Sequence, residues 1–244
     1  MTDILLDPPL QQLVRPVHDH GLHGQALTAC GLVVQRGDLR LSADLNFSLI
    51  AGQVLHVQGR NGAGKSTLLQ MLAGLLPLAQ HKMLRWGDVS PAEWPILYIG
   101  HKMGLSSALS VIDNLMFLQQ LNRGDSREIA AALAMVGLAG YEETLVAQLS
   151  SGQKRRVHLA RLWLAGDQPL WLLDEPLTAL DQRIAAVLCT RMADYAAGGG
   201  RVMLTSHQPL SIAVDILDLD EFALLSNGES GRAEDEVWQE YSEQ

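Results

Sequence analysis

The chain has 244 residues, enough for one large domain or for a domain with a subdomain. Hydrophobic residues make up 48% of it and the formal net charge is −9, which argues against a general nucleic-acid-binding face. No apolar run approaches the ~20 residues of a membrane span, and the first residues lack a signal-peptide pattern. We therefore expect a protein that is soluble alone, with any membrane role exerted through a partner. Cys30 and Cys189 follow no metal spacing, so reduced core thiols are expected.

Residues 1–24 are predicted to form an extension outside the folded body, because they are rich in proline and polar residues. His18, His20 and His23 leave a metal or haem contact open, but a polar leader is the simpler interpretation, since no ligand geometry can be read there.

Alternating apolar residues from Leu27 to Leu49, with a turn at Arg36-Gly37-Asp38, predict a small and partly antiparallel sheet.

A phosphate-binding loop is the most informative motif of the chain. Its residues fit G-x-x-x-x-G-K-[ST], between an apolar run over 54–57 and a helical pattern that extends to Leu76. The glycines allow backbone N–H groups to surround phosphate oxygens, and the helix N-terminus adds its dipole. Lys65 is expected to reach the β- and γ-phosphates of a nucleotide, and Ser66 to ligate Mg²⁺. The motif consists of Gly59, Arg60, Asn61, Gly62, Ala63, Gly64, Lys65, Ser66 and Thr67.

Residues 77–93 are predicted to be irregular, and residues 95–100 to form a buried strand. A helical insert over about 102–165 follows. Within it, N-terminal caps are expected at Ser110 with Asp113 and at Asp125 with Glu128, and Gly137 is expected to end a helix.

The continuous apolar run Leu170–Leu173 predicts a strand that is covered on both faces, and it delivers Asp174 and Glu175 at its tip. This is the Walker B pattern. Asp174 is expected to hold Mg²⁺, and Glu175 to polarise the attacking water.

After Walker B, a helix capped by Asp181 is predicted to run through Tyr195 and to close at residues 198–200. Residues 201–205 are expected to form the next strand, and residues 222–225 a late one. The acidic tail over 229–244 is expected to hold one short helix around Trp238.

Residues 149–153, Leu-Ser-Ser-Gly-Gln, precede a basic helix. An ordinary serine N-cap would explain this pentapeptide alone. Beside the other two motifs it resembles the signature motif of ABC-transporter ATPases, usually Leu-Ser-Gly-Gly-Gln. The resemblance implies contact with the γ-phosphate of an ATP held by a second subunit, and hence a homodimer with two ATPs between its protomers. The contacting residues would be Ser150, Ser151, Gly152 and Gln153.

Ala179-Leu180-Asp181 resembles the D-loop of the same ATPases, which places Asp181 at the dimer seam. His207 follows a predicted strand end and resembles the switch histidine. It could donate to the γ-phosphate and hold Glu175 or the water in place. The catalytic set implied is Lys65, Glu175 and His207.

Two positions depart from the family pattern. Arg36 stands where an aromatic residue usually stacks on adenine, and a guanidinium can also stack on a base. His101 stands where the Q-loop glutamine is expected. An imidazole is a poorer Mg²⁺ ligand than an amide oxygen, but His101 is kept in the predicted metal set with Ser66 and Asp174.

A narrower resemblance rests on Tyr98–His101, 149–164, 170–176 and 204–208 taken together. These segments resemble the ATP-binding subunits of the bacterial cytochrome c maturation haem exporter, in which a Q-loop histidine is typical. The resemblance implies an ATP hydrolase that drives haem export or release of a haem-loaded chaperone. Its partners would be an integral-membrane permease and haem-handling subunits, at the cytoplasmic face of the inner membrane. No C-x-x-C-H motif is present, so haem is not expected to bind directly.

The predicted fold is α/β, a P-loop NTPase of the ABC type with a mostly parallel core sheet, a small antiparallel β subdomain and a helical signature subdomain. The ATPase domain would span 25–228. An ABC ATPase for another substrate is the main alternative. A DNA-repair or chromosome ATPase is disfavoured because fewer than a hundred residues separate the phosphate loop from the signature, and a translation factor because only one cassette is present.

Overall fold

A five-stranded parallel sheet forms the centre of the computed structural model, which describes residues 22, 24–78, 84–89, 93–122, 128–165 and 168–224. Every neighbouring pair of strands in this sheet runs parallel. In spatial order the strands are β10 (Asp215–Asp218), β5 (Val54–Gln58), β9 (Arg201–Thr205), β8 (Leu170–Leu173) and β7 (Ile96–Ile99).

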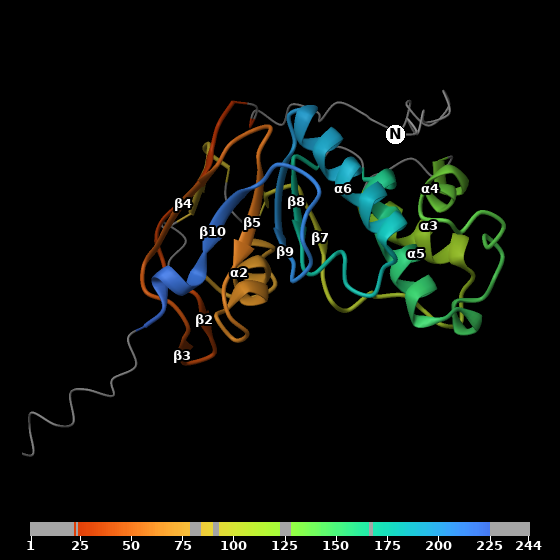
Figure 1. Cartoon of the computed structure of the whole chain (residues 1–244), viewed down its shortest axis with the longest axis horizontal. Coiled ribbons are helices and arrows are strands. Elements are labelled where there is room, and N and C mark those ends of the chain that lie inside the picture. Colours follow the sequence, from red (N-terminus) through yellow and green to blue (C-terminus); the bar gives the residue numbers. More distant parts are fainter. Residues whose placement is uncertain are drawn as a thin grey trace, which may run out of the picture.

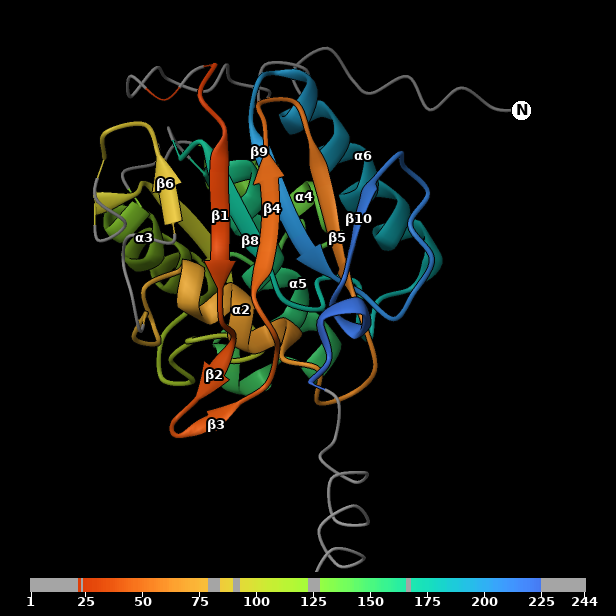
Figure 2. The ribbon, with the colours of Figure 1, turned by 90° about the vertical axis from the view of Figure 1, so that its left-hand side faces the viewer.

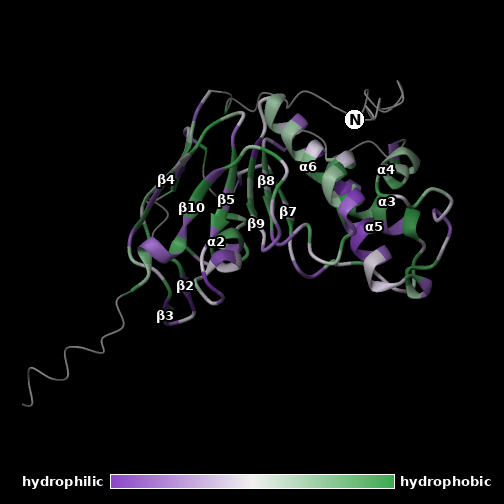
Figure 3. Ribbon diagram, in the orientation of Figure 1, coloured by the Kyte–Doolittle hydropathy of each residue, from purple (hydrophilic) through white to green (hydrophobic). Residues whose placement is uncertain are grey.

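The sheet is buried on both faces, which explains the near-continuous apolar runs of its central strands. Successive side chains of a strand point to opposite faces. In β8, Leu170 and Leu172 belong to one hydrophobic cluster, whereas Trp171 and Leu173 belong to the other. Figure 3 shows hydrophobic colour along the central strands and hydrophilic colour on the first turns of α5.

One face of the sheet is covered by α2 (Lys65–Leu72) and by a three-stranded antiparallel sheet in the order β4-β1-β6 (Figure 2). A short hairpin continues from β1. The strands of this layer are β1 (Leu27–Leu32), β2 (Gln35–Arg36), β3 (Leu39–Arg40), β4 (Leu45–Leu49) and β6 (Leu84–Trp86).

The other face is covered by four helices, which Figure 1 shows on the far side of the sheet from β4. They are α3 (Val111–Asn122), α4 (Ile129–Met135), α5 (Ser151–Leu164) and α6 (Gln182–Ala197). The phosphate-loop helix α2 and the signature helix α5 therefore lie on opposite faces of the parallel sheet.

The predicted helix caps are largely confirmed. The hydroxyl of Ser110 accepts from the Asp113 N–H at 3.1 Å and donates to the Asp113 carboxylate at 2.6 Å. Asp181 accepts from the Ile184 N–H at 2.9 Å, and Gly137 follows α4 with a φ of 70°. Asp125 lies outside the described residues. Its expected partner Glu128 does not lie inside the helix as predicted, because α4 begins at Ile129 and the Glu128 side chain makes no capping hydrogen bond.

Three element predictions were wrong. Residues 77–93 are not irregular throughout, because β6 pairs with β1 from within them. The late strand is β10 rather than residues 222–225, and Leu219–Phe222 forms a 3₁₀ turn. β10 was missed because it is an edge strand with only two apolar residues between aspartates. Helix α2 ends at Leu72, since Gly74 adopts a φ of 71°, a left-handed conformation.

The folded body begins earlier than predicted. Leu22 is 1% exposed, and its carbonyl accepts from the Arg201 guanidinium at 3.1 Å, so Leu22 is not part of an outer extension. Both cysteines are free thiols, but only Cys189 is buried; Cys30 is exposed on β1, so its prediction as a core thiol was wrong. His18, His20, His23 and the tail over 229–244 lie outside the described residues.

Candidate nucleotide site

The predicted motifs meet at the carboxyl edge of the parallel sheet, where ligands of open α/β sheets bind. β5 leads into the phosphate loop, β8 ends before Asp174, and β9 ends at Thr205, two residues before His207. Parallel pairing of β5 with β9 and of β9 with β8 brings these three strand ends side by side.

The phosphate loop needs glycine for its backbone shape and for close packing. Gly59, Gly62 and Gly64 have φ values of 134°, 88° and 101°. A Cβ on Gly64 would also lie 2.9 Å from the Val34 Cγ1 atom, because the segment around the β2–β3 hairpin packs on the loop. The ammonium of Lys65 donates to the Gly59 carbonyl at 2.6 Å, which curls the loop back over its own helix.

The 3₁₀ turn Leu219–Phe222 packs against this loop and hydrogen-bonds to it. The Arg60 N–H donates to the Asp220 carboxylate at 2.9 Å, and the Ala63 N–H donates to the Arg60 carbonyl at 3.1 Å. Asn61 is exposed at the tip of the loop. The loop is therefore held in shape by protein contacts, with its outer rim open to solvent.

The Asp174 carboxylate is buried beside the hydroxyl oxygens of Ser66 and Thr205. It is 4% exposed, and its Oδ1 accepts from the Ser66 hydroxyl at 2.8 Å and from the Thr205 hydroxyl at 2.9 Å. Thr67, the next residue of the loop motif, is also buried. Carboxylate and hydroxyl oxygens are hard ligands of the kind that Mg²⁺ prefers, so the residues present fit this ion.

Glu175 and His207, predicted to act together, do meet. The Glu175 Oε1 atom lies 3.4 Å from His207 Nε2, and Oε2 accepts from the His207 N–H at 3.3 Å. The Thr178 hydroxyl also donates to Oε2 at 3.2 Å. Glu175 itself has a φ of 51°, which is unusual for a residue with a side chain and costs free energy.

A polar cavity of about 350 Å³ lies between the loop and the end of β9. Sequence reasoning missed His56, which lines it. His56 is 7% exposed, and its Nε2 lies 3.1 Å from the Ser206 carbonyl oxygen, so that nitrogen is the donor. The lining residues are His56, Gln58, Gly59, Lys65, Ser206, His207, Gln208 and Pro209.

Arg155 is a second residue that was given no role from the sequence. Its guanidinium is buried and donates to three carbonyls, those of Gly100 at 3.2 Å, Asp174 at 3.3 Å and Glu175 at 2.6 Å. Burial lowers the pKa of Arg155, and the nearby carboxylates of Asp174 and Glu175 oppose that effect. The sequence did contain a signal for its burial, because Arg155 lies four and seven residues before Leu159 and Leu162 and so shares their buried helix face.

The signature pentapeptide begins α5 with a reciprocal capping box. Ser150 accepts from the Gln153 N–H at 3.2 Å, and Gln153 accepts from the Ser150 N–H at 2.9 Å. Ser150 and Ser151 are exposed, and a Cβ on Gly152 would lie 4.0 Å from the Ala179 carbonyl oxygen. The signature and the exposed Asp181 segment therefore adjoin each other, but no hydrogen bond or ion pair joins the pentapeptide to the phosphate loop among the residues that the structure describes.

Two further predicted site residues lie at the protein surface. His101 is exposed beyond the end of the edge strand β7, and Arg36 is exposed on the β2–β3 hairpin. Within the described ranges, no group of three or more His, Cys, Asp or Glu side chains is arranged to hold a metal ion. This absence does not bear on the predicted set of Ser66, Asp174 and His101, because that set holds only two such side chains, and His101 as a metal ligand stays a prediction.

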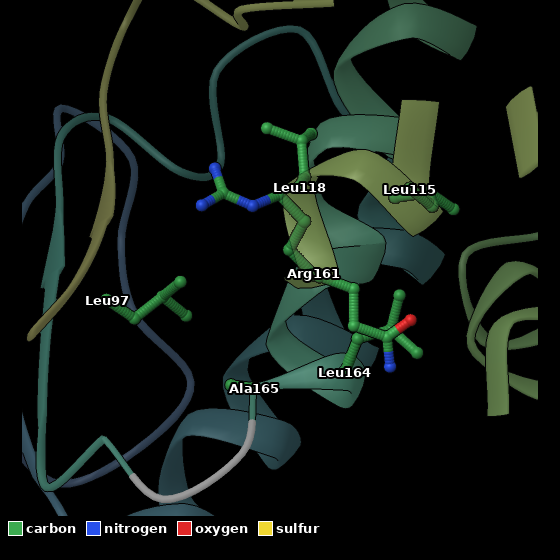
Figure 4. A pocket seen from close by; sticks show the side chains of 7 residues that line it. Leu97, Leu115, Leu118, Arg161, Leu164 and Ala165 are labelled. Carbon is green, nitrogen blue, oxygen red and sulfur yellow. The ribbon is translucent and has the colours of Figure 1, made fainter. Parts of the chain in front are cut away.

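A second hollow, of about 10 Å³, lies between β7, α3 and α5 (Figure 4). It has room for about one water molecule. Arg161 extends along it among Leu97, Leu115 and Leu164, and burial lowers the pKa of Arg161 to about 10. This small hollow is lined mainly by apolar side chains, unlike the polar cavity beside the phosphate loop.

The fold and the order of motifs along it define the class of P-loop ATPases with an inserted helical subdomain. The family model described as ABC transporter matches residues 42–178, more than half of the chain. The chain belongs to this family. Its ABC ATPase domain therefore binds ATP, and ATP hydrolysis is the reaction of the family.

Among proteins of this family, the chain is similar to ATP-binding proteins of cytochrome c biogenesis. The chain is 44% identical over 191 residues to the cytochrome c biogenesis ATP-binding export protein CcmA of Yersinia pestis, covering 75% of this chain and 87% of that protein. It is 42% identical over 192 residues to CcmA of Escherichia coli K12, covering 77% and 91%.

Solved structures agree on the fold. An ABC transporter ATP-binding protein from Pyrococcus furiosus superposes with a TM-score of 0.71 at 23% identity, over 82% of this chain and all of that one. An ATP-binding subunit of an ABC transporter gives a TM-score of 0.65 at 24% identity. The predicted fold class is confirmed. None of the helices in the described part of the chain is both long and apolar enough to span a bilayer.

Proposed function

We propose that this chain is the ATP-hydrolysing subunit of an ABC-type complex in cytochrome c biogenesis, where it couples ATP hydrolysis to haem export or to release of a haem-loaded chaperone. The observation that carries the proposal is the 42–44% identity to CcmA proteins over about three quarters of the chain. The phosphate loop, Walker B acids and switch histidine all stand at one sheet edge, which supports an active ATPase rather than a degenerate one.

In the binding step, the loop amides of residues 59–64 and Lys65 hold the phosphates of ATP. Lys65 must exchange its bond to the Gly59 carbonyl for phosphate oxygens. Ser66 and Asp174, whose oxygens lie 2.8 Å apart, would hold Mg²⁺, which supplies neutralising charge at the phosphates. Arg36 is proposed to stack on the base from the hairpin.

In the hydrolytic step, Glu175 polarises water and His207 holds that carboxylate in place while donating toward the γ-phosphate. The 3.4 Å separation of His207 Nε2 from Glu175 Oε1 supports this division of roles. General-base assistance of this kind contributes about 10²–10⁴ in rate. Catalysis therefore depends on Glu175, His207 and Lys65, which lie at the carboxyl edge of the parallel sheet.

A homodimer completes the site. α5 and α2 lie on opposite faces of the sheet, and Ser150 and Ser151 are exposed, which leaves them open to a second subunit. Two copies arranged head to tail would bring Ser150, Ser151, Gly152 and Gln153 of each to the ATP of the other, with Asp181 at the seam. The dimer would sit peripherally on an integral-membrane permease, at the cytoplasmic face of the inner membrane, and His101 would lie toward that partner.

The proposal is tested by complementation and co-purification. In a host that lacks its own maturation ATPase, the wild-type chain should restore covalent haem in c-type cytochromes, and Lys65→Ala should not. From detergent extracts, the wild type should recover the membrane proteins of cytochrome c maturation. Recovery of an unrelated permease, with no restored haem attachment, would assign the chain to transport of another substrate.

A further inference from the structure

Thr205 joins the two acids of the site through one hydroxyl group. It is the last residue of β9 and is 0% exposed. Its hydroxyl donates to Asp174 Oδ1 at 2.9 Å and accepts from the Glu175 N–H at 2.9 Å. Because a hydroxyl has one proton and two lone pairs, it can make both bonds at once only in these directions. The Thr205 hydroxyl therefore donates one hydrogen bond and accepts another, and the two bonds fix its orientation.

Both residues that bond to Thr205, Glu175 and Asp174, depend on their surroundings for their conformation. Glu175 has a φ of 51°, and its backbone is fixed on one side by Thr205 and on the other by Arg155, which donates to its carbonyl at 2.6 Å. Asp174 presents the same Oδ1 atom to Ser66 and to Thr205. A left-handed backbone at a residue with a side chain persists only where its surroundings enforce it.

We infer that Thr205 is a positioning residue that sets the oxygen of Asp174 and the carboxylate of Glu175 in a fixed relation to each other. This inference rests on the proposed ATPase function and adds to it a residue to which neither the motif pattern nor the family relation assigns a role. The branched side chain restricts the hydroxyl to few rotamers, and its apolar part continues the buried strand after Leu204. A valine would keep the shape of Thr205 and lose both hydrogen bonds.

The test compares Thr205→Val with Thr205→Ser, which keeps the hydroxyl, in the full-length chain. Thr28→Val is the matched control, since within the described part of the chain the Thr28 hydroxyl makes a single hydrogen bond, a long one of 3.5 Å to the Arg85 carbonyl on the antiparallel sheet. The measurements are kcat, KM for ATP, and the Mg²⁺ concentration that gives half of the thermal stabilisation by a non-hydrolysable ATP analogue. The last of these reports on binding without turnover.

For Thr205→Val, kcat should fall about ten-fold or more, because a buried N–H and a carboxylate each lose a partner. KM for ATP should stay within about two-fold, and the half-saturating Mg²⁺ concentration should rise several-fold. Thr205→Ser should stay within about two-fold of the wild type in all three, and Thr28→Val should match the wild type. If Thr205→Val does not fold, Thr205→Ala is measured against Thr205→Ser in its place.

Wild-type values of kcat and Mg²⁺ dependence in Thr205→Val would overturn the inference. Equal losses in Thr205→Ser and Thr205→Val would also overturn it, because Thr205→Ser keeps the hydroxyl, and the loss would then not depend on the two hydrogen bonds. If the wild-type chain itself showed neither Mg²⁺-dependent hydrolysis nor stabilisation by the analogue, the proposed function would fail first.

Discussion

Arg155 offers a test of how the signature helix is joined to the acid pair. Replacing Arg155 by methionine keeps an unbranched apolar stem and removes the guanidinium. Three carbonyls then lose their donor, those of Gly100, Asp174 and Glu175. The first of these follows β7 and the others follow β8, so a single side chain on α5 links two strand ends.

The expected loss of stability can be worked out from these contacts. A hydrogen bond from a charged donor contributes roughly 1.5–3 kcal/mol, and three such bonds to one group are not additive. Because Arg155 is 8% exposed, its own desolvation offsets part of the gain. We expect the free energy of unfolding to fall by about 3 kcal/mol. At about 2–4 °C per kcal/mol, the melting temperature should fall by roughly 6–12 °C.

Urea unfolding gives the free energy, and steady-state ATPase assays give kcat and KM. Arg156→Met is the control, because Arg156 is only partly buried and donates to Val136 and Gly137 at 3.2 and 3.4 Å, remote from the acid pair. Its loss of stability should be about 1 kcal/mol, with kcat unchanged. Arg155→Met should lose kcat about ten-fold as well, because the Glu175 carbonyl is freed.

A fall in stability with wild-type kcat in Arg155→Met would refute the reasoning, since Arg155 would then support the fold and not the placement of Glu175. Equal effects from Arg155→Met and Arg156→Met would refute it as well. Arg155→Lys should fall between the wild type and Arg155→Met, because an ammonium cannot reach all three carbonyls in a fixed fork.

Three further perturbations have definite expected outcomes. Burial, with Arg161 and Arg155 nearby, lowers the pKa of His158 from 6.5 to about 3. The stability from neutral His158 is therefore complete above pH 6.5 and is lost as the pH falls toward 3, by about 2 kcal/mol at pH 5. Urea unfolding of His158→Gln should lack this loss between pH 7 and pH 5; an unchanged slope would contradict the assignment. Gly64→Ala should lower the melting temperature and weaken ATP-analogue binding, since its φ is 101° and its Cβ would meet Val34; wild-type binding by calorimetry would speak against the loop geometry. Lys65→Ala should abolish analogue binding at concentrations that saturate the wild type, and retained affinity would show that the phosphates bind elsewhere.

The elements that could be predicted are those whose pattern is local. The run Leu170–Leu173 needs no partner to be read as a doubly buried strand, and glycine at Gly64 marks the turn into α2. β6 and β10 could not be read in this way. β10 has only Ile216 and Leu217 as apolar residues, and it is a strand because its backbone pairs with β5, more than 150 residues away.

The same division holds within the site. Asp174, Glu175 and His207 lie within two residues of strand ends, and Lys65 begins the helix after the phosphate loop, so their meeting could be inferred from the order of motifs. The contacts of Thr205, Arg155 and His56 arise from tertiary packing. Thr205 reads as the end of an apolar strand, and only the structure shows that its hydroxyl lies between two acids. The burial of Leu22 likewise depends on Arg201, 179 residues away.

Assembly is the most direct test of the central claim that ATP is held between two copies of this chain. Glu175→Gln, loaded with Mg²⁺ and ATP, should sediment as a dimer that retains two nucleotides and hydrolyses them far more slowly than the wild type, while Lys65→Ala stays monomeric. A Glu175→Gln chain that stayed monomeric under these conditions, even with its membrane partner added, or that turned over ATP at the wild-type rate, would contradict the account.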